Sequence, residues 1–280
     1  MAKRKFYIDN EKNERFSLWG NRVYMVDPSG LGIKHDASYI RIGNSFLRNK
    51  MHVAQSKVAG KIEFMDPGAN DKFVEFYNFC AGSEKLYLVY DPGNGTEYIR
   101  DIDIGEVKKT ERTGGTLPIT INFNCKSLYY LKNNNRFIFE AGSSEKRYDY
   151  AYDYAYGDYG TYEAAIVNNG HVEAPFECVI YGYCTDPAIH IIKDGVLLYE
   201  VVFPVAVEEG EYIRYSSRDG MLEATLVSLD GSERNLMPLL DISNDNFFKI
   251  PIGNSKIMFN SSSESTNVIT ATIYKMYEVV

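Results

Sequence analysis

"LPITINFNCKSLYY", residues 117–130, is the stretch that decides the fold class. Its alternation places Ile119, Ile121 and Phe123 on one face of an extended chain and polar side chains on the other. A period of two over this length is typical of a half-buried β-strand. The stretch therefore predicts a sheet with one face packed against a core.

The same strand character recurs along the whole chain. In the first half it is found in KFYIDN, RFSLWG, YIRIGNSFLR, GKIEFM, KLYLVY and EYIRDIDIGEV, and in the second half in YEAAIVNNG, PFECVIYGYC, AIHIIKDGVLLYEVVF, EYIRYSSRDGMLEATLVSL and VITATIYKMYEVV. Three Asp-Gly pairs, at 194–195, 219–220 and 230–231, supply the positive φ angles of tight turns. We therefore predict a mainly β protein.

Asp-Pro pairs are the second kind of turn signal in this sequence. They occur at 27–28, 66–67, 91–92 and 186–187. The aspartate satisfies nearby backbone donors, and proline cannot donate to a strand ladder. We expect these pairs to separate strands.

One segment, "ANDKFVEFYNFCAGS" at residues 69–83, has helical periodicity instead. Its apolar residues recur at i, i+3, i+4 and i+7, namely Phe73, Phe76, Tyr77 and Cys80. Asn70 or Asp71 is expected to cap the start and Gly82 to close the end. The pattern predicts one helix near 71–81 that packs on a sheet.

The chain is expected to divide into two domains. Residues 1–135 are expected to form an N-terminal β domain that contains the helix. Residues 136–147, which follow three asparagines and contain Gly-Ser-Ser and a charge cluster, are expected to form a linker. Residues 148–280 form an antiparallel β-sandwich or jelly roll, because short strands alternate with frequent turn signals.

"RYDYAYDYAYGDYGTYE", residues 147–163, opens the second domain with tyrosine at every other position from Tyr148 to Tyr156. Rings on one face of a strand can stack on sugars or bases. However, Asp149 and Asp153 between them repel phosphates, and tyrosine is a favoured strand residue in its own right. We expect an entry strand of which several rings pack against protein. If Tyr150, Tyr152 and Tyr154 point to open solvent around a groove, a sugar-binding surface is favoured instead.

Composition and charge argue against several classes of function. The 280 residues are 45% hydrophobic with a formal net charge of −8, which argues against wrapping duplex DNA. The N-terminus lacks the apolar stretch of a secretion signal, and no apolar run reaches the length of about 18 residues that a membrane span requires. We expect a protein made in the cytoplasm, without sequence-specific nucleic-acid binding or membrane insertion.

The sequence carries no recognisable catalytic, cofactor or metal motif. The histidines and cysteines show no ligand-like spacing, and we expect the cysteines to be buried thiols: His35, His52, His171, His190, Cys80, Cys125, Cys178 and Cys184. "DIDIGE" at 101–106 has glycine where a calcium loop needs an oxygen ligand, so it is interpreted as a strand. No catalytic, cofactor-binding or metal-binding residue is therefore assigned.

A series of weaker motifs follows one another in a characteristic order. They are VDPSGLG at 26–32, YIRIGNSFLRNK at 39–50, GKIEFMD at 60–66, FVEFYNFC at 73–80, SEKLYLVY at 83–90 and INFNCKSLYY at 121–130. In this order and spacing they resemble the distal tail proteins of long-tailed phages and prophages of Gram-positive bacteria. The alternating tyrosine stretch between two domains is also similar to some members of that family.

The resemblance implies a structural, non-enzymatic protein of the phage virion tail. It implies an N-terminal β-sandwich with one flanking α-helix, which forms a hexameric ring between tail tube and tail tip, and a galectin-like C-terminal β-sandwich. That domain would hold adhesion proteins or contact host surface sugars, and the partners would be the tail-tube, tail-tip and receptor-binding proteins. No cofactor or reactive residue is implied.

Two other function classes remain open from the sequence. A carbohydrate-binding module that recognises a bacterial cell-surface glycan fits the sandwich-like second half and its tyrosines. A hydrolase acting on cell-wall polymer requires two facing carboxylates in a cleft, which sequence alone does not single out.

Overall fold

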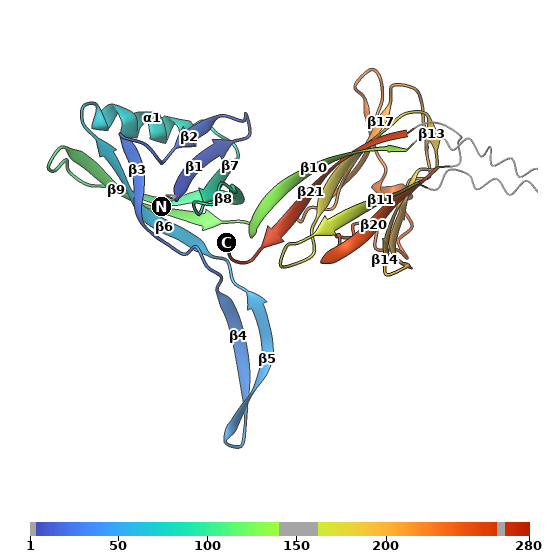
Figure 1. Ribbon diagram of the computed structural model, residues 1–280, viewed down its shortest axis with the longest axis horizontal. Helices are drawn as coiled ribbons and strands as arrows, with labels where there is room; N and C mark the ends of the chain where they lie inside the picture. The colour runs from blue at the N-terminus through green and yellow to red at the C-terminus, as the bar shows by residue number, and fades with distance from the viewer. Residues whose placement is uncertain (1–3, 140–161, 262–266) are drawn as a thin grey trace, which may run out of the picture. The chain divides into compact units, whose positions relative to one another are not determined.

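The computed structural model describes residues 4–139, 162–261 and 267–280 (Figure 1). The chain forms two compact units, one of residues 1–131 with 277–280 and one of residues 132–276. Both consist mainly of antiparallel strands, and the described residues contain one α-helix, so the predicted mainly β fold is confirmed. The tyrosine row and most of the predicted linker lie outside the described residues.

The N-terminal unit contains nine complete strands, the helix and the start of a tenth strand. The elements are β1 (Lys5–Asn10), β2 (Arg15–Ser17), β3 (Val23–Ser29), β4 (His35–Ile42), β5 (Ser45–Val53), β6 (Lys57–Met65), α1 (Ala69–Ala81), β7 (Leu86–Asp91), β8 (Tyr98–Lys109), β9 (Thr116–Cys125) and β10 (Tyr129–Phe139).

The long strand β8 organises the N-terminal unit. Its first half pairs with β7, which continues to β1 and β2, and its second half pairs with β9, which continues to β6 and β3. The register shifts between Ile104 and Glu106, where an extra residue bends the strand. The apolar faces of both halves contribute to one core that includes Ile8, Ile62 and Phe123.

The stretch that decided the fold class behaves as predicted. In β9, Ile119, Ile121 and Phe123 are at most 1% exposed, and the polar residues between them are half-buried. Alternate side chains of a strand point to opposite faces, so this pattern places one face in the core.

The predicted helix is confirmed as α1, with a different start. Phe76 packs in the core against Phe64 of β6 and Phe16 of β2, with ring centroids 6.0 and 5.3 Å apart. Asn70 and Asp71 do not cap the helix: the N-cap is Gly68, in the left-handed conformation and without a side-chain cap. The helix starts earlier than expected because Gly68 adopts a φ of 86° without a Cβ clash.

Most turn signals lie where the sequence placed them. Asp194 and Gly195, with φ of 52° and 76°, connect β14 (Ala188–Lys193) to β15 (Val196–Val202), and the other two Asp-Gly pairs also fall between strands. The expectation for Asp27-Pro28 is wrong. That pair lies inside β3, at a register shift between Val26 and Ser29 where the strand bulges and tolerates proline.

The C-terminal unit contains the remaining strands. They are β11 (Tyr162–Asn168), β12 (Phe176–Tyr181), β13 (Cys184–Thr185), β14, β15, β16 (Ala206–Val207), β17 (Tyr212–Ser216), β18 (Glu223–Val227), β19 (Glu233–Asn235), β20 (Gly253–Asn260) and β21 (Asn267–Tyr277), with a 3₁₀ turn at Met237–Leu239.

Two antiparallel sheets share the core of this unit. One has the order β11-β20-β14-β15, and the other runs from β19 through β18, β17, β12 and β21 to β10. Ile189 and Ile257 from the first sheet and Ile180 and Ile213 from the second belong to the same buried cluster. This is the packing of a β-sandwich, in which the inner faces of two sheets interdigitate.

The chain passes between the units twice. It leaves the N-terminal unit along β10 after Leu131, and it returns at the end of β21, so that the last four residues belong to the N-terminal unit.

Candidate functional site

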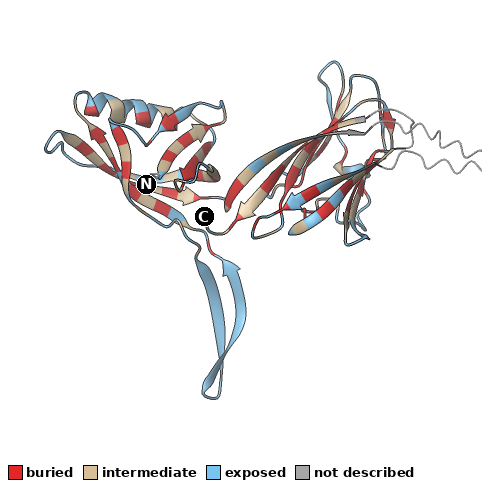
Figure 2. Ribbon diagram, viewed as in Figure 1, coloured by how far each residue is buried: buried red, intermediate tan, exposed pale blue. Residues whose placement is uncertain are grey.

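The hairpin of β4 and β5 is the most exposed ordered element of the N-terminal unit. Its two strands pair only with each other and project from the rest of the unit as an arm (Figure 1). Every residue of both strands is exposed, as Figure 2 shows along its length. The sequence predicted strands here, but the alternation did not reveal that neither face reaches a core.

The arm is unusually apolar for an exposed element. Its large exposed apolar side chains, with exposed fractions from 40% to 69%, are Tyr39, Ile40, Ile42, Phe46, Leu47, Met51 and Val53. Contiguous apolar surface on a soluble domain marks a site of interaction. An isolated two-stranded hairpin is also only marginally stable in water, so it needs a binding surface.

The register of the hairpin sorts its side chains into two different faces. Tyr39 pairs with Arg48 and Arg41 pairs with Phe46, and paired residues share a face, so this face carries two aromatic rings and two guanidinium groups. Ile40 pairs with Leu47, which makes the other face aliphatic. We call the first of these the aromatic–arginine face.

The base of the arm is fixed to the body of the unit. The Ala54 amide donates to the Lys34 carbonyl at 2.8 Å, and the Cys125 amide donates to the Ser56 carbonyl at 3.0 Å. The side chain of Arg100, 4% exposed, also contacts Ser56 and donates to the Ser127 carbonyl at 2.7 Å. These bonds fix where the arm leaves the sheet.

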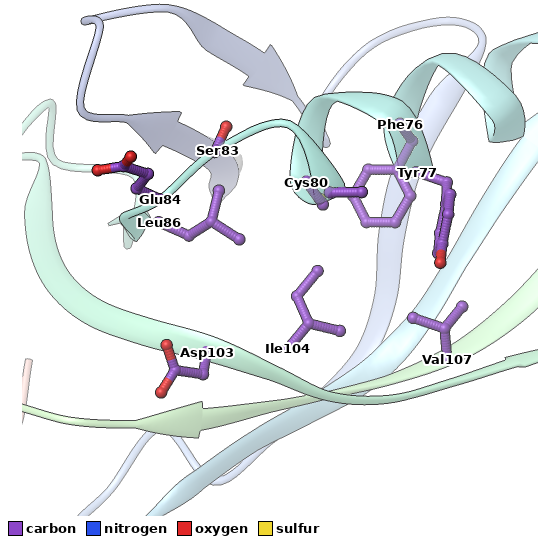
Figure 3. Close-up of a pocket in the computed structure, with 10 residues that line it drawn as sticks. Phe76, Tyr77, Cys80, Ser83, Glu84, Leu86, Asp103, Ile104 and Val107 are labelled. Atoms are coloured by element: carbon purple, nitrogen blue, oxygen red, sulfur yellow. The ribbon is translucent and has the colours of Figure 1, made fainter.

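A groove of about 320 Å³ lies elsewhere in the same unit, between the C-terminal half of α1 and strand β8 (Figure 3). Its walls are apolar: Phe76, Tyr77 and Cys80 come from the helix, and Ile104 and Val107 come from the strand. Tyr77 is 54% exposed, so the groove opens to solvent beside an aromatic ring. We call it the α1–β8 groove.

Two carboxylates, Glu84 and Asp103, stand at one end of this groove (Figure 3). The Asp103 side chain is 60% exposed and pairs with Lys126 at 2.9 Å. A glycosidase needs one carboxyl that is kept protonated by an apolar environment to act as its general acid. Because Asp103 is solvated and ion-paired, the two carboxylates form an acidic rim and lack the features of a hydrolytic pair.

Metal ligands, thiols and membrane-spanning helices were the other chemical features considered from the sequence. Among the described residues, no three His, Cys, Asp or Glu side chains gather to hold a metal ion. All four cysteines are free and buried, which confirms the prediction of buried thiols. No helix in the described part of the chain is long and apolar enough to cross a membrane.

His190 of β14 is the exception among the histidines, because it is buried in the C-terminal unit at 8% exposure. Its Nε2 lies 3.3 Å from Oε1 of Glu200, its partner on β15, but neither ring nitrogen makes a hydrogen bond. Burial lowers the pKa of His190, and the Glu200 carboxylate opposes this shift. No sequence pattern marks this environment, because the neighbours of His190 come from other strands.

Comparison with known proteins gives the family and the fold. Residues 5–126 match the family described as the distal tail protein, N-terminal domain. The structure is similar to a chain of the phage P2 baseplate in its activated conformation with calcium, with a TM-score of 0.68, 16% identity and coverage of 99% of each chain. No protein of curated function matches the sequence.

A second likeness is to the SPP1 Dit protein, described as a paradigm of the hub adsorption apparatus in phages that infect Gram-positive bacteria. The TM-score is 0.61 at 11% identity, over 95% of this chain and 98% of that one. Likeness at such low identity establishes a shared fold, whereas the family match rests on the sequence of the N-terminal unit. The N-terminal unit therefore belongs to the distal tail protein family, a family of structural phage-tail proteins, and the whole chain has the fold of the two similar phage proteins.

Proposed function

We propose that this protein forms a homo-hexameric ring that links the tail tube to the tail tip, and that its arm holds neighbouring copies together. The observation that carries this proposal is the β4–β5 arm, whose residues are all exposed and whose surface is largely apolar. The similar solved structures come from a phage baseplate and from a hub adsorption protein, which supports a place at the tail tip.

Burial of the exposed apolar side chains of the arm favours its binding to a partner. Fully burying a large apolar side chain contributes about 1.5–3 kcal/mol. The arm exposes seven such side chains, so covering even part of it offsets much of the entropy lost on association. A closed ring needs two different patches on each copy that meet head to tail, and the arm supplies one of them.

The C-terminal unit is proposed to face outward, where it attaches adhesion proteins or contacts the host surface. The other partners are the tail-tube, tail-tip and receptor-binding proteins of the same phage. The net charge of −8 suits a ring through which DNA passes, since like charge keeps a duplex from adhering to the wall.

A shortened arm tests the ring. Replacing residues 38–50 by Asn-Gly keeps the pairs His35–Val53, Asp36–His52 and Ala37–Met51 and closes them with a tight turn. We expect the full chain to form hexamers in native mass spectrometry at high concentration, and the shortened chain to stay monomeric with an unchanged circular dichroism spectrum. Equal assembly of the two chains would contradict a role of the arm.

A carbohydrate-binding module is the second candidate, and one observation favours it. The ring nitrogens of His190 and the Oδ1 of Asn260 are buried polar atoms of the sheet β11-β20-β14-β15 that make no hydrogen bond within the described residues. Sugar hydroxyls can supply such partners. Binding of the full chain to purified Gram-positive cell walls, lost in His190→Ala, would support it, and unchanged binding by the variant would exclude this site.

A further inference from the structure

We propose that the α1–β8 groove of one copy receives the tip of the β4–β5 arm of the next copy, through the aromatic–arginine face. This rests on the proposed self-assembly and adds to it the surface that accepts the arm.

The shape of the groove fits part of the arm tip. Its volume of about 320 Å³ lies at the lower end of the range for small-molecule sites, roughly 300–1,000 Å³. It is therefore suited to one or two large side chains. Phe46, 69% exposed and beside the hairpin turn, is the aromatic ring best placed to enter between Tyr77 and Val107.

Charge complementarity favours the arm over other apolar segments. In a chain with a net charge of −8, residues 35–53 carry three cations, Arg41, Arg48 and Lys50, against one carboxylate, Asp36. None of these cations pairs with a carboxylate within the described residues.

The groove supplies the opposite charge through Glu84, which lines one end of it beside Asp103, the partner of Lys126. An apolar wall with acidic groups at its end matches an arm face on which aromatic rings alternate with arginines. Guanidinium groups bind carboxylates well, because their planar donors match both oxygens.

The positions of the two surfaces set the direction of assembly. Within the N-terminal unit, α1 and the tip of the arm lie at opposite ends, so an arm does not reach the groove of its own chain (Figure 1). A donor at one end and an acceptor at the other produce a heterologous contact, which closes into a ring when the rotation allows it. A two-fold dimer is not expected from this arrangement.

Chemical cross-linking tests the contact directly. The double variant Ser45→Cys/Ala81→Cys places one thiol at the hairpin turn and one on the wall of the groove, and it keeps Phe46, Arg48 and Glu84. The native cysteines are buried, so they contribute little background. With a short bis-maleimide at high protein concentration, we expect a ladder of covalent oligomers that ends at six.

The matched control is Ser45→Cys/Glu75→Cys, because Glu75 is exposed on α1 two residues from Tyr77 and does not line the groove. Cross-linking rates follow local concentration. We expect the ladder to form at least about tenfold faster in the groove variant than in the control. Adding Arg48→Glu to the groove variant should lower the rate of cross-linking, and adding Glu84→Arg to that chain should restore the rate.

The outcomes separate this inference from the proposed function. Equal cross-linking in the groove variant and the control overturns the contact. If the shortened arm still abolishes assembly in that case, the arm binds a different surface of the next copy and the ring remains. If the unmodified chain does not assemble and the groove variant does not cross-link at any concentration, both proposals are overturned.

Discussion

The rings of Tyr98 and Tyr277 meet edge to face, with centroids 5.4 Å apart and planes at 81°. Tyr98 opens β8 in the N-terminal unit, whereas Tyr277 ends β21, three residues before the last residue. The C-terminus therefore completes the core of the N-terminal unit, and the fold of that unit depends on residues from both ends of the sequence.

Tyr277→Ala tests whether the C-terminal residues complete the core of the N-terminal unit. Tyr277 is 8% exposed, and truncating a buried aromatic residue loses its transfer free energy and leaves a cavity. We expect the free energy of unfolding of the N-terminal unit to fall by about 2–4 kcal/mol in urea titrations. Val279→Ala, at a position 46% exposed in the same segment, should change it by less than about 0.5 kcal/mol. Equal effects of the two substitutions would show that the C-terminal segment is not packed as described.

Phe46 and Phe64 are predicted to have different roles, Phe46 in assembly and Phe64 in the core. Phe46 on the arm is 69% exposed and Phe64 in β6 is 0% exposed. We expect Phe46→Ala to leave the unfolding free energy of the monomer within about 0.5 kcal/mol, and Phe64→Ala to lower it by about 3–5 kcal/mol. Chemical denaturation at low protein concentration measures both. A large loss in Phe46→Ala would mean that the arm packs within its own chain.

The four cysteines should be unreactive in the native protein. Burial raises the pKa of Cys80 and Cys184 to about 12 and also raises the pKa of Cys178, so almost no thiolate is present at neutral pH. Cys125 is buried as well. We expect no thiol to react with a disulfide reagent within minutes at pH 7, and all four to react in denaturant. One rapidly reacting thiol in the native chain would contradict the described burial.

Lowering the pH should destabilise the C-terminal unit through His190. Burial lowers the pKa of His190 in the folded chain, so the unfolded chain binds the proton first. The stability contribution of the neutral imidazole is present above the unfolded pKa, about 6.5, and is lost as the pH falls through the folded value. Calorimetry at pH 7.5 and 5.0 should show a larger drop in the melting temperature of wild type than of His190→Gln.

The comparison with the glutamine variant isolates this histidine, because all other titrating groups are common to both chains. The expected sign is a loss of stability on acidification. An equal pH dependence in both chains would show that His190 binds a proton as readily in the folded protein as in the unfolded one.

Elements with local sequence signals could be predicted from the amino-acid sequence. The alternation of residues 117–125 became β9, the helical spacing of residues 73–80 became α1, and the Asp-Gly pairs became turns. These patterns suffice because side-chain direction within one strand or helix follows from its own geometry. The order of the short motifs also indicated a resemblance to the distal tail protein family, and the family match over residues 5–126 confirms it.

The neighbours of each strand or helix face, in contrast, follow from the packing of the whole chain. "YIRIGNSFLR" alternates like a half-buried strand, yet β4 and β5 find no sheet to cover either face, because periodicity reports two faces but not their neighbours. The α1–β8 groove, the return of Tyr277 to the first unit and the buried His190 likewise arise from residues distant in sequence. Contacts of this kind are set by how whole elements pack, and no local pattern encodes them.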